Sequence, residues 1–197
     1  ILLEAFSIIE RTAAKLIIHS QVNVKSFFPD KGKLIDELLQ EGSLEIIEKS
    51  VHAPGLYHLG DVYVYPTRLE GIGLTIAEAI SCGLPAIVTD QRPMNEFVGS
   101  SAAGRLIKVH HEEMRGDNYY WPQSIADVQS LANQMEFFIK EQKDIQIIKK
   151  EAREYALNNL DWNRNLVEFG QKLKDIQKIY SSDKSRAIEM ASEYDNC

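Results

Sequence analysis

Cysteine is scarce in this sequence, and its scarcity excludes two kinds of small protein. Only Cys82 and Cys197 occur among 197 residues, and they lie far apart in the chain. Two such cysteines make neither a disulfide framework nor the paired spacing of a zinc site. We therefore expect a chain from a reducing compartment, which predicts a cytoplasmic location.

Long apolar runs and an excess of positive charge are lacking as well. No run approaches the roughly 18 apolar residues of a membrane-spanning helix, so no transmembrane segment is expected. Lys and Arg number 22 against 29 Asp and Glu, which gives a net charge of −7. Such a surface does not attract phosphate backbones, which argues against nucleic acid as a partner. A small anion remains compatible, because backbone amides can hold one locally.

The first residues lack the features of a secretory leader. The segment ILLEAF has no initiator Met, no basic stretch and an acid at position 4. It is typical of the middle of a helix, so we expect the chain to be part of a longer one.

Short apolar runs alternate with helical patterns along most of the chain. The runs are continuous rather than alternating, as in strands buried on both faces. The predicted strands are 15–19, 44–48, 62–65, 85–89 and 105–109, and the region from Ser124 onward is predicted to be helical. This order predicts an α/β fold, a Rossmann-like open parallel sheet with helices on both faces, followed by C-terminal helices. We expect one domain over 1–180 and a loose polar tail over 181–197.

The loop after the third predicted strand carries the strongest functional signal. Ligands of open α/β sheets bind at the carboxyl ends of strands, and here Gly71 and Gly73 directly precede a helix. The free amides of the first helical turn favour an anion such as a diphosphate. Arg68 could add charge there or be a solvated loop residue. Ile76 stands where a dinucleotide fingerprint has Gly or Ala, which disfavours an NAD site.

Two acids could serve the same pocket. Glu70 lies in the loop, and Glu78 lies about one turn inside the following helix, where side chains lean toward the N-terminus. One carboxylate could accept hydrogen bonds from ribose, and the other could face developing charge near the phosphate. The equally open alternative is that both acids are solvated.

Three segments read together are far more specific than either acid. Residues 61–67 read DVYVYPT, residues 70–79 read EGIGLTIAEA and residues 82–89 read CGLPAIVT. This pattern resembles the nucleotide-sugar-binding half of retaining family 4 glycosyltransferases, which have the GT-B fold. Weaker similarity runs from Leu2 to about Trp162.

The resemblance implies a role for each matching residue. Glu78 matches the acid that holds the ribose hydroxyls of the donor, and Glu70 matches the acid near the donor sugar that is assigned a catalytic role. Glu96 matches a third family acid, although Arg92 and Pro93 replace the paired glycines that usually precede it. The residues that match the diphosphate-binding turn are Gly71, Ile72, Gly73, Leu74 and Thr75.

The implied substrate is a UDP- or GDP-sugar, with no metal ion and no other cofactor. The implied partner is a glycan or lipid-linked acceptor, bound by an N-terminal domain that lies upstream of this sequence. The family's Arg and Lys and the first strand of this domain also lie upstream, so we expect the chain to be inactive alone. Any attachment to a membrane surface would come through that upstream half. The alternatives are a nucleotide-sugar epimerase of similar architecture and a non-catalytic nucleotide-sugar-binding or scaffold module.

Other residues have structural interpretations that compete with functional ones. His110 and His111 could suggest a metal site, but neighbours in a strand point to opposite faces. His19 and His52 follow strands and could flank a base, although structural roles are favoured. Tyr63 alternates with valines and is expected in the core, as is Tyr65.

Overall fold

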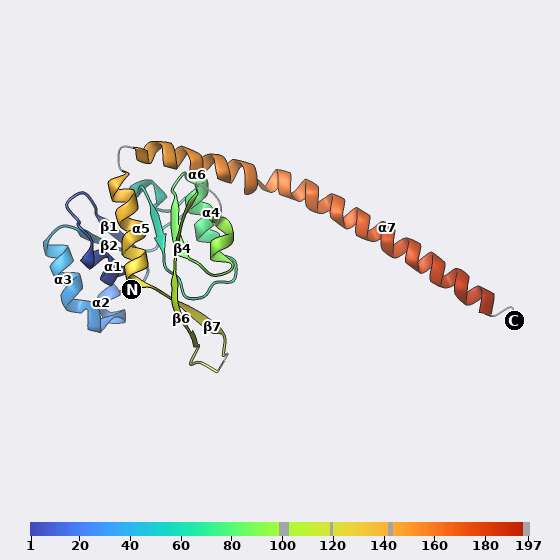
Figure 1. Cartoon of the computed structure of the whole chain (residues 1–197), viewed down its shortest axis with the longest axis horizontal. Coiled ribbons are helices and arrows are strands. Elements are labelled where there is room, and N and C mark those ends of the chain that lie inside the picture. The colour runs from blue at the N-terminus through green and yellow to red at the C-terminus, as the bar shows by residue number, and fades with distance from the viewer. Residues whose placement is uncertain (99–102, 119, 142–143, 195–197) are drawn as a thin grey trace. The chain divides into compact units, whose positions relative to one another are not determined.

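The structure is a computed structural model that describes residues 1–98, 103–118, 120–141 and 144–194 (Figure 1). Two compact units divide the chain, Ile1–Leu157 and Asn158–Cys197. The strands that the structure describes all belong to the first unit.

Five short strands of the first unit run parallel to their neighbours, which confirms the α/β class and all five predicted strands. In the first sheet β1 (Leu16–Ser20) pairs with β2 (Leu44–Glu48). In the second sheet β4 (Ala86–Thr89) lies between β3 (Tyr63–Tyr65) and β5 (Gly104–Ile107). The strands form two hydrogen-bonded sheets where the sequence predicted one.

One hydrophobic core joins the two sheets and the helices around them. The cluster includes Leu16 from the first sheet, Ile87 and Ile107 from the second, Phe6 from α1 and Leu131 from α5. The helices of this unit are α1 (Leu2–Ile8), α2 (Val24–Phe27), α3 (Gly32–Gln40), α4 (Leu74–Ser81), α5 (Val128–Lys140) and, as far as Leu157, α6 (Ile145–Asn159). The 3₁₀ turns η1 (Pro29–Lys31), η2 (Tyr57–Leu59) and η3 (Met94–Phe97) lie between them.

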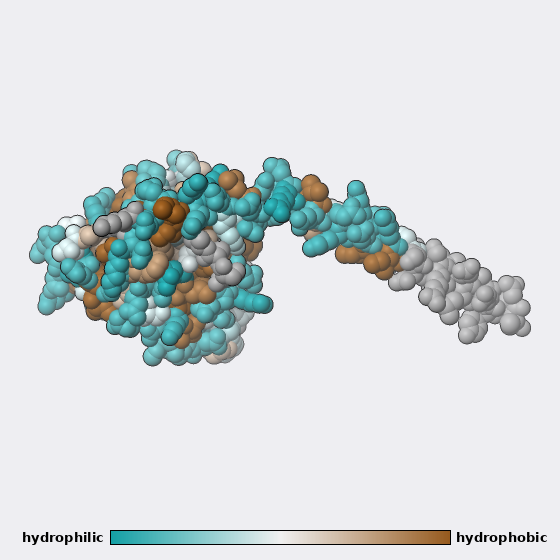
Figure 2. All heavy atoms as spheres, turned by 45° about the horizontal axis from the view of Figure 1, so that its top comes forward, coloured by the Kyte–Doolittle hydropathy of each residue, from teal (hydrophilic) through white to brown (hydrophobic). Residues whose placement is uncertain are grey.

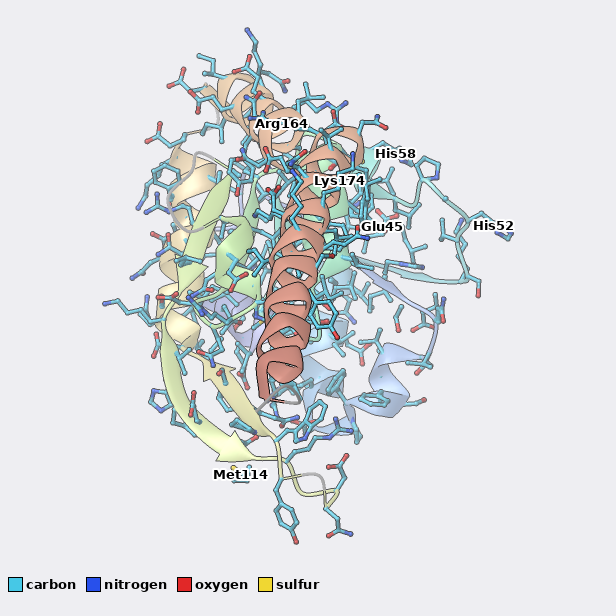
Figure 3. All side chains as sticks on the ribbon, turned by 90° about the vertical axis from the view of Figure 1, so that its right-hand side faces the viewer. Glu45, His52, His58, Met114, Arg164 and Lys174 are labelled. Atoms are coloured by element: carbon cyan, nitrogen blue, oxygen red, sulfur yellow. The ribbon has the colours of Figure 1, made fainter. Side chains whose placement is uncertain are left out.

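An antiparallel hairpin replaces the start of the helical region expected from Ser124. Its strands are β6 (Val109–Met114) and β7 (Pro122–Ala126), and Figure 1 shows it extending beyond the parallel strands. Helix α5 begins only at Val128, because the Asp127 carboxylate accepts a hydrogen bond from Ser130 N at 2.6 Å and caps the helix. Met114 lies near the tip of the hairpin (Figure 3).

The second unit contains one long helix, α7 (Trp162–Tyr194). The helix continues through 181–194, where the sequence analysis expected a loose tail, and 195–197 lie outside the described residues. Its apolar side chains between 162 and 180 are more than half exposed, and Figure 2 shows them gathered along the helix. In the described part of the chain, no helix is both long and apolar enough to cross a membrane.

Candidate functional site

The loop after β3 is held by hydrogen bonds from two other strands. Thr89, fully buried at the end of β4, donates its hydroxyl to the Thr67 carbonyl at 2.8 Å. Ser124 of β7 donates its backbone N–H to the Arg68 carbonyl at 2.9 Å. The Arg68 guanidinium also forms an ion pair with Glu113 of β6 at 3.2 Å, so part of its positive charge is neutralised by an acid of the hairpin. The loop that leads to Glu70 therefore has a defined backbone path.

Replacing Thr89 by valine is expected to lower the free energy of unfolding by about 1–2 kcal/mol. Valine keeps the shape of the side chain but leaves the Thr67 carbonyl without this donor. Urea denaturation measures the change. Thr12→Val, at an exposed position, is the control and should change stability by less than about 0.5 kcal/mol. An equal change in both variants would contradict the anchoring role of Thr89.

The glycine turn before α4 leaves the start of that helix without a side-chain cap. Gly73 is the N-cap residue with φ 82° and ψ 43°, a left-handed conformation that favours glycine. A Cβ on Gly73 would lie 3.0 Å from Ile76 Cδ1, whereas Gly71 has open space around it. Ile72 and Leu74 have exposed side chains, at 61% and 60%. The turn is therefore open on its outer side and offers the amides of a helix N-terminus to an anion.

Glu70 has one carboxylate oxygen occupied by hydroxyl groups. The Tyr65 hydroxyl donates to Oε1 at 2.5 Å, and the Thr67 hydroxyl donates to the same oxygen at 3.3 Å. The side chain is half-buried. Within the described residues, no hydrogen bond to Oε2 is formed.

Glu78 has a matching arrangement on the exposed side of α4. The Tyr57 hydroxyl donates to its Oε2 at 2.6 Å, while Oε1 has no protein partner among the described residues. Each acid thus accepts a tyrosine hydrogen bond on one carboxylate oxygen, and its other oxygen accepts none from the described residues.

Tyr57, Tyr63 and Tyr65 form a continuous tyrosine row that joins the two acids. The Tyr57 and Tyr63 rings meet edge to face at 5.9 Å, and the Tyr63 and Tyr65 rings stack at 5.5 Å between centroids. The structure therefore brings Glu70 and Glu78 to the two ends of one row. Burial raises the pKa of all three hydroxyls, that of Tyr65 to about 12, and the neighbouring carboxylates add to the effect. The hydroxyls therefore remain donors at neutral pH.

The tyrosine row corrects the sequence interpretation of β3. Val62 and Val64 pack against the core, whereas Tyr63 and Tyr65 lie on the opposite face and are only half-buried. The alternation of Tyr and Val in DVYVY could have indicated two different faces. Tyr57 was not singled out, because it lies in the short segment before β3 and forms no sequence motif with Glu78.

The remaining turn residue, Thr75, lies next to the tyrosine row. Its side chain is close to the Tyr63 and Tyr65 hydroxyls and influences their pKa. Its Oγ1 is buried and makes no hydrogen bond of good geometry with the described residues.

Glu96 comes from a neighbouring element and is bound differently. It lies on η3 with an exposed side chain and forms an ion pair with Arg92 at 3.5 Å. η3 packs beside the turn, since a Cβ on Gly73 would lie 3.7 Å from the Phe97 ring. No hydrogen bond links Glu96 to Glu70 or Glu78 in the described parts of the chain.

Among the described residues, His19, His52, His110 and His111 form no hydrogen bond or ion pair with Glu70 or Glu78. His19 Nε2 is 2.7 Å from the Lys49 carbonyl, a structural contact, and His52 is exposed on the loop after β2 (Figure 3). His110 and His111 have different acidic neighbours, Asp127 and Glu113. No group of three or more His, Cys, Asp or Glu residues in the described segments could hold a metal ion. Cys82 is a free thiol, and Cys197 lies outside the described residues.

The family model "Glycosyl transferases group 1" matches residues 1–155. The chain is 35% identical over 79 residues to the lipopolysaccharide core biosynthesis mannosyltransferase LpsB of Rhizobium meliloti, which is 39% of this chain and 21% of that protein. It is 28% identical over 123 residues to the Escherichia coli UDP-Gal:alpha-D-GlcNAc-diphosphoundecaprenol alpha-1,3-galactosyltransferase, which is 62% of this chain and 26% of that protein.

A solved structure of HepE from Anabaena in complex with UDP has a similar fold. The TM-score is 0.66 at 17% sequence identity, over 88% of this chain and 44% of that one. This likeness confirms the GT-B type of α/β fold that the sequence resemblance implied. The chain spans less than half the length of these three proteins.

Proposed function

The chain belongs to the group 1 glycosyl transferase family, and from that premise we propose that it is the donor-binding half of a retaining glycosyltransferase. A sugar would pass from a nucleoside diphosphate to an acceptor hydroxyl with its anomeric configuration kept. The observation that carries this proposal is the placement of Glu70 and Glu78 at the two ends of the tyrosine row, which lies next to the uncapped start of α4.

Each part of the donor has a proposed site. The diphosphate would lie against the amides of Gly71–Thr75, where the dipole of α4 favours negative charge. Glu78 would accept hydrogen bonds from the ribose hydroxyls, and Glu70 would face the positive charge that develops at the anomeric carbon. Glu96, on the adjacent η3, would contact the donor from the other side of the turn. Fixed dipoles and charges of this kind stabilise a transition state without reorganising during the reaction.

Three similar proteins support a nucleotide-sugar substrate. Two carry names of a mannosyltransferase and of a UDP-galactose-dependent galactosyltransferase, and the third was solved in complex with UDP. We infer that the donor of this chain is a UDP- or GDP-sugar and that the reaction needs no metal ion. The acceptor, a glycan or lipid-linked molecule, would bind through an N-terminal domain.

The proposal includes a domain over 1–180 that lacks its first strand, with a polar segment after it. β1 pairs only with β2, and β3 only with β4, among the described strands. Each of β1 and β3 therefore has one edge with unpaired backbone groups. A strand seated between these two edges would join the two sheets into the single open sheet expected from the sequence.

The experiment that tests the proposal is thermal unfolding of the chain with UDP, GDP or ADP. A diphosphate present at 100 times its Kd should add about 2.7 kcal/mol to the stability of the folded state. UDP or GDP should stabilise the chain and inorganic phosphate at equal concentration should not. If none of the three nucleotides raises the unfolding temperature, the donor-binding proposal fails.

A second assay separates transfer from epimerisation. The chain joined to the N-terminal domain of its own full-length protein should move labelled sugar to an acceptor hydroxyl. Epimerisation of the free nucleotide sugar without transfer would overturn the transferase proposal in favour of an epimerase.

A further inference from the structure

We propose that Tyr57 is a positioning residue that orients the Glu78 carboxylate toward the ribose of the bound nucleotide. The inference rests on the proposed function and adds a residue from outside the motif that carries both acids. Tyr57 lies 21 positions before Glu78, at the start of η2.

Glu78 needs such a partner because its own surroundings leave it free to rotate. It is an exposed side chain on α4, and a long side chain in water loses rotamer freedom when it is bound in one orientation. The hydrogen bond from Tyr57 to Oε2 selects one orientation before any ligand arrives. Pre-organisation of this kind lowers the entropy lost on binding.

Tyr57 is itself held by a neighbouring ring. It packs edge to face on Tyr63, and it lies close to Gly55, where an added Cβ would be 3.4 Å from Tyr57 Cε2. The ring is half-buried, and its 2.6 Å hydrogen bond has the length of a charge-assisted O–H···O⁻ bond. The packed ring therefore presents its hydroxyl from a defined position, and the hydrogen bond sets the orientation of the Glu78 carboxylate.

The hydrogen bond from Tyr57 leaves acceptor positions of the Glu78 carboxylate open for a ribose. A carboxylate has about four acceptor positions on two oxygens, and Tyr57 uses one of them on Oε2. The 2′ and 3′ hydroxyls of a ribose are neighbouring donors that could use Oε1 and the remaining position on Oε2. Tyr65 and Glu70 repeat this arrangement at the other end of the tyrosine row. Glu70 Oε1 accepts the hydrogen bond from Tyr65, and Glu70 Oε2 accepts none from the described residues.

The test compares Tyr57→Phe with the unchanged chain, using the diphosphate that binds (UDP or GDP) and its 2′,3′-dideoxy form. Isothermal titration calorimetry should show about 10-fold weaker binding of the ribonucleotide to Tyr57→Phe, because the ligand itself must then order the Glu78 side chain. The dideoxy form should bind both proteins equally, within about twofold, because it has no hydroxyl for Glu78 to hold.

Controls keep the outcome specific. Tyr180→Phe, at an exposed position of α7, makes the same chemical change and should alter neither affinity. In a Glu78→Ala background, Tyr57→Phe should cause no further loss. Equal weakening of both nucleotides, or no weakening of either, would overturn the positioning role while the proposed function stands. An unchanged chain that binds no nucleotide would instead overturn the proposed function, and this inference with it.

Discussion

Glu78→Ala is expected to weaken binding of UDP or GDP about 100-fold. Two ribose hydroxyls would each lose a hydrogen bond to a charged acceptor, and each such bond contributes about 1.5 kcal/mol or more. The folded state should be little affected, because Glu78 is an exposed residue whose described partner is the Tyr57 hydroxyl. Isothermal titration calorimetry measures the affinity, and urea denaturation checks that stability changes by less than about 1 kcal/mol.

Glu151→Ala is the matched control for this variant. Glu151 is an exposed acid on α6 and lies outside the candidate site, so its removal changes net charge equally without touching the donor. Its affinity for nucleotide should stay within about twofold of the unchanged chain. If Glu78→Ala binds nucleotide as well as Glu151→Ala does, Glu78 does not hold the ribose.

Gly104→Ala is expected to lower the free energy of unfolding by about 3 kcal/mol or more. Gly104 stands opposite Ala86 where β5 pairs with β4. A Cβ on Gly104 would overlap the backbone of Ala86, and backbone cannot move aside as a flexible side chain can. β5 would have to shift away from the centre of its sheet, and buried Ile107 would shift with it.

The control for this prediction is Gly32→Ala. Gly32 begins α3 and has no atom within 4 Å of the position of an added Cβ. Alanine there should leave stability unchanged or raise it slightly, since alanine favours helix more than glycine does. Urea denaturation curves of equal midpoint for the two variants would contradict the close pairing of β4 and β5 at Gly104.

The parallel strands could be predicted from the sequence because each contains a short apolar run. Only β4, over 86–89, is buried at every position, as expected of a strand covered on both faces. Gly83 and Pro85 separate α4 from β4 unambiguously. What the pattern could not predict was the division into two sheets, because pairing between strands leaves no trace within a single strand.

The β6–β7 hairpin was missed for a different reason. Its strands are largely exposed, so they lack the apolar runs on which the other predictions depended. Residues from Ser124 also include Ile125 and Val128, which fit helical spacing as well as a strand end. The cap at Asp127 decides between the two, because it starts the helix after the strand has ended.

The candidate site was predictable in its motif and not in its surroundings. The glycine turn and the two acids lie in one short segment, so spacing and resemblance could identify them together. The tyrosine row depends on a contact between η2 and α4, which brings Tyr57 to Glu78. Such contacts come from the packing of separate elements, and a single sequence gives no measure of them. The roles of the site residues stay predictions.

The most direct test of the account is a titration of the ¹⁵N-labelled chain with UDP and GDP followed by amide NMR. Donor binding at the glycine turn should give saturable shifts centred on the backbone amides of Gly71–Thr75, where the diphosphate would lie, together with smaller shifts around Tyr57 and Glu78. Saturable shifts centred elsewhere, for example on the β6–β7 hairpin, would contradict it, as would the absence of any saturable shift.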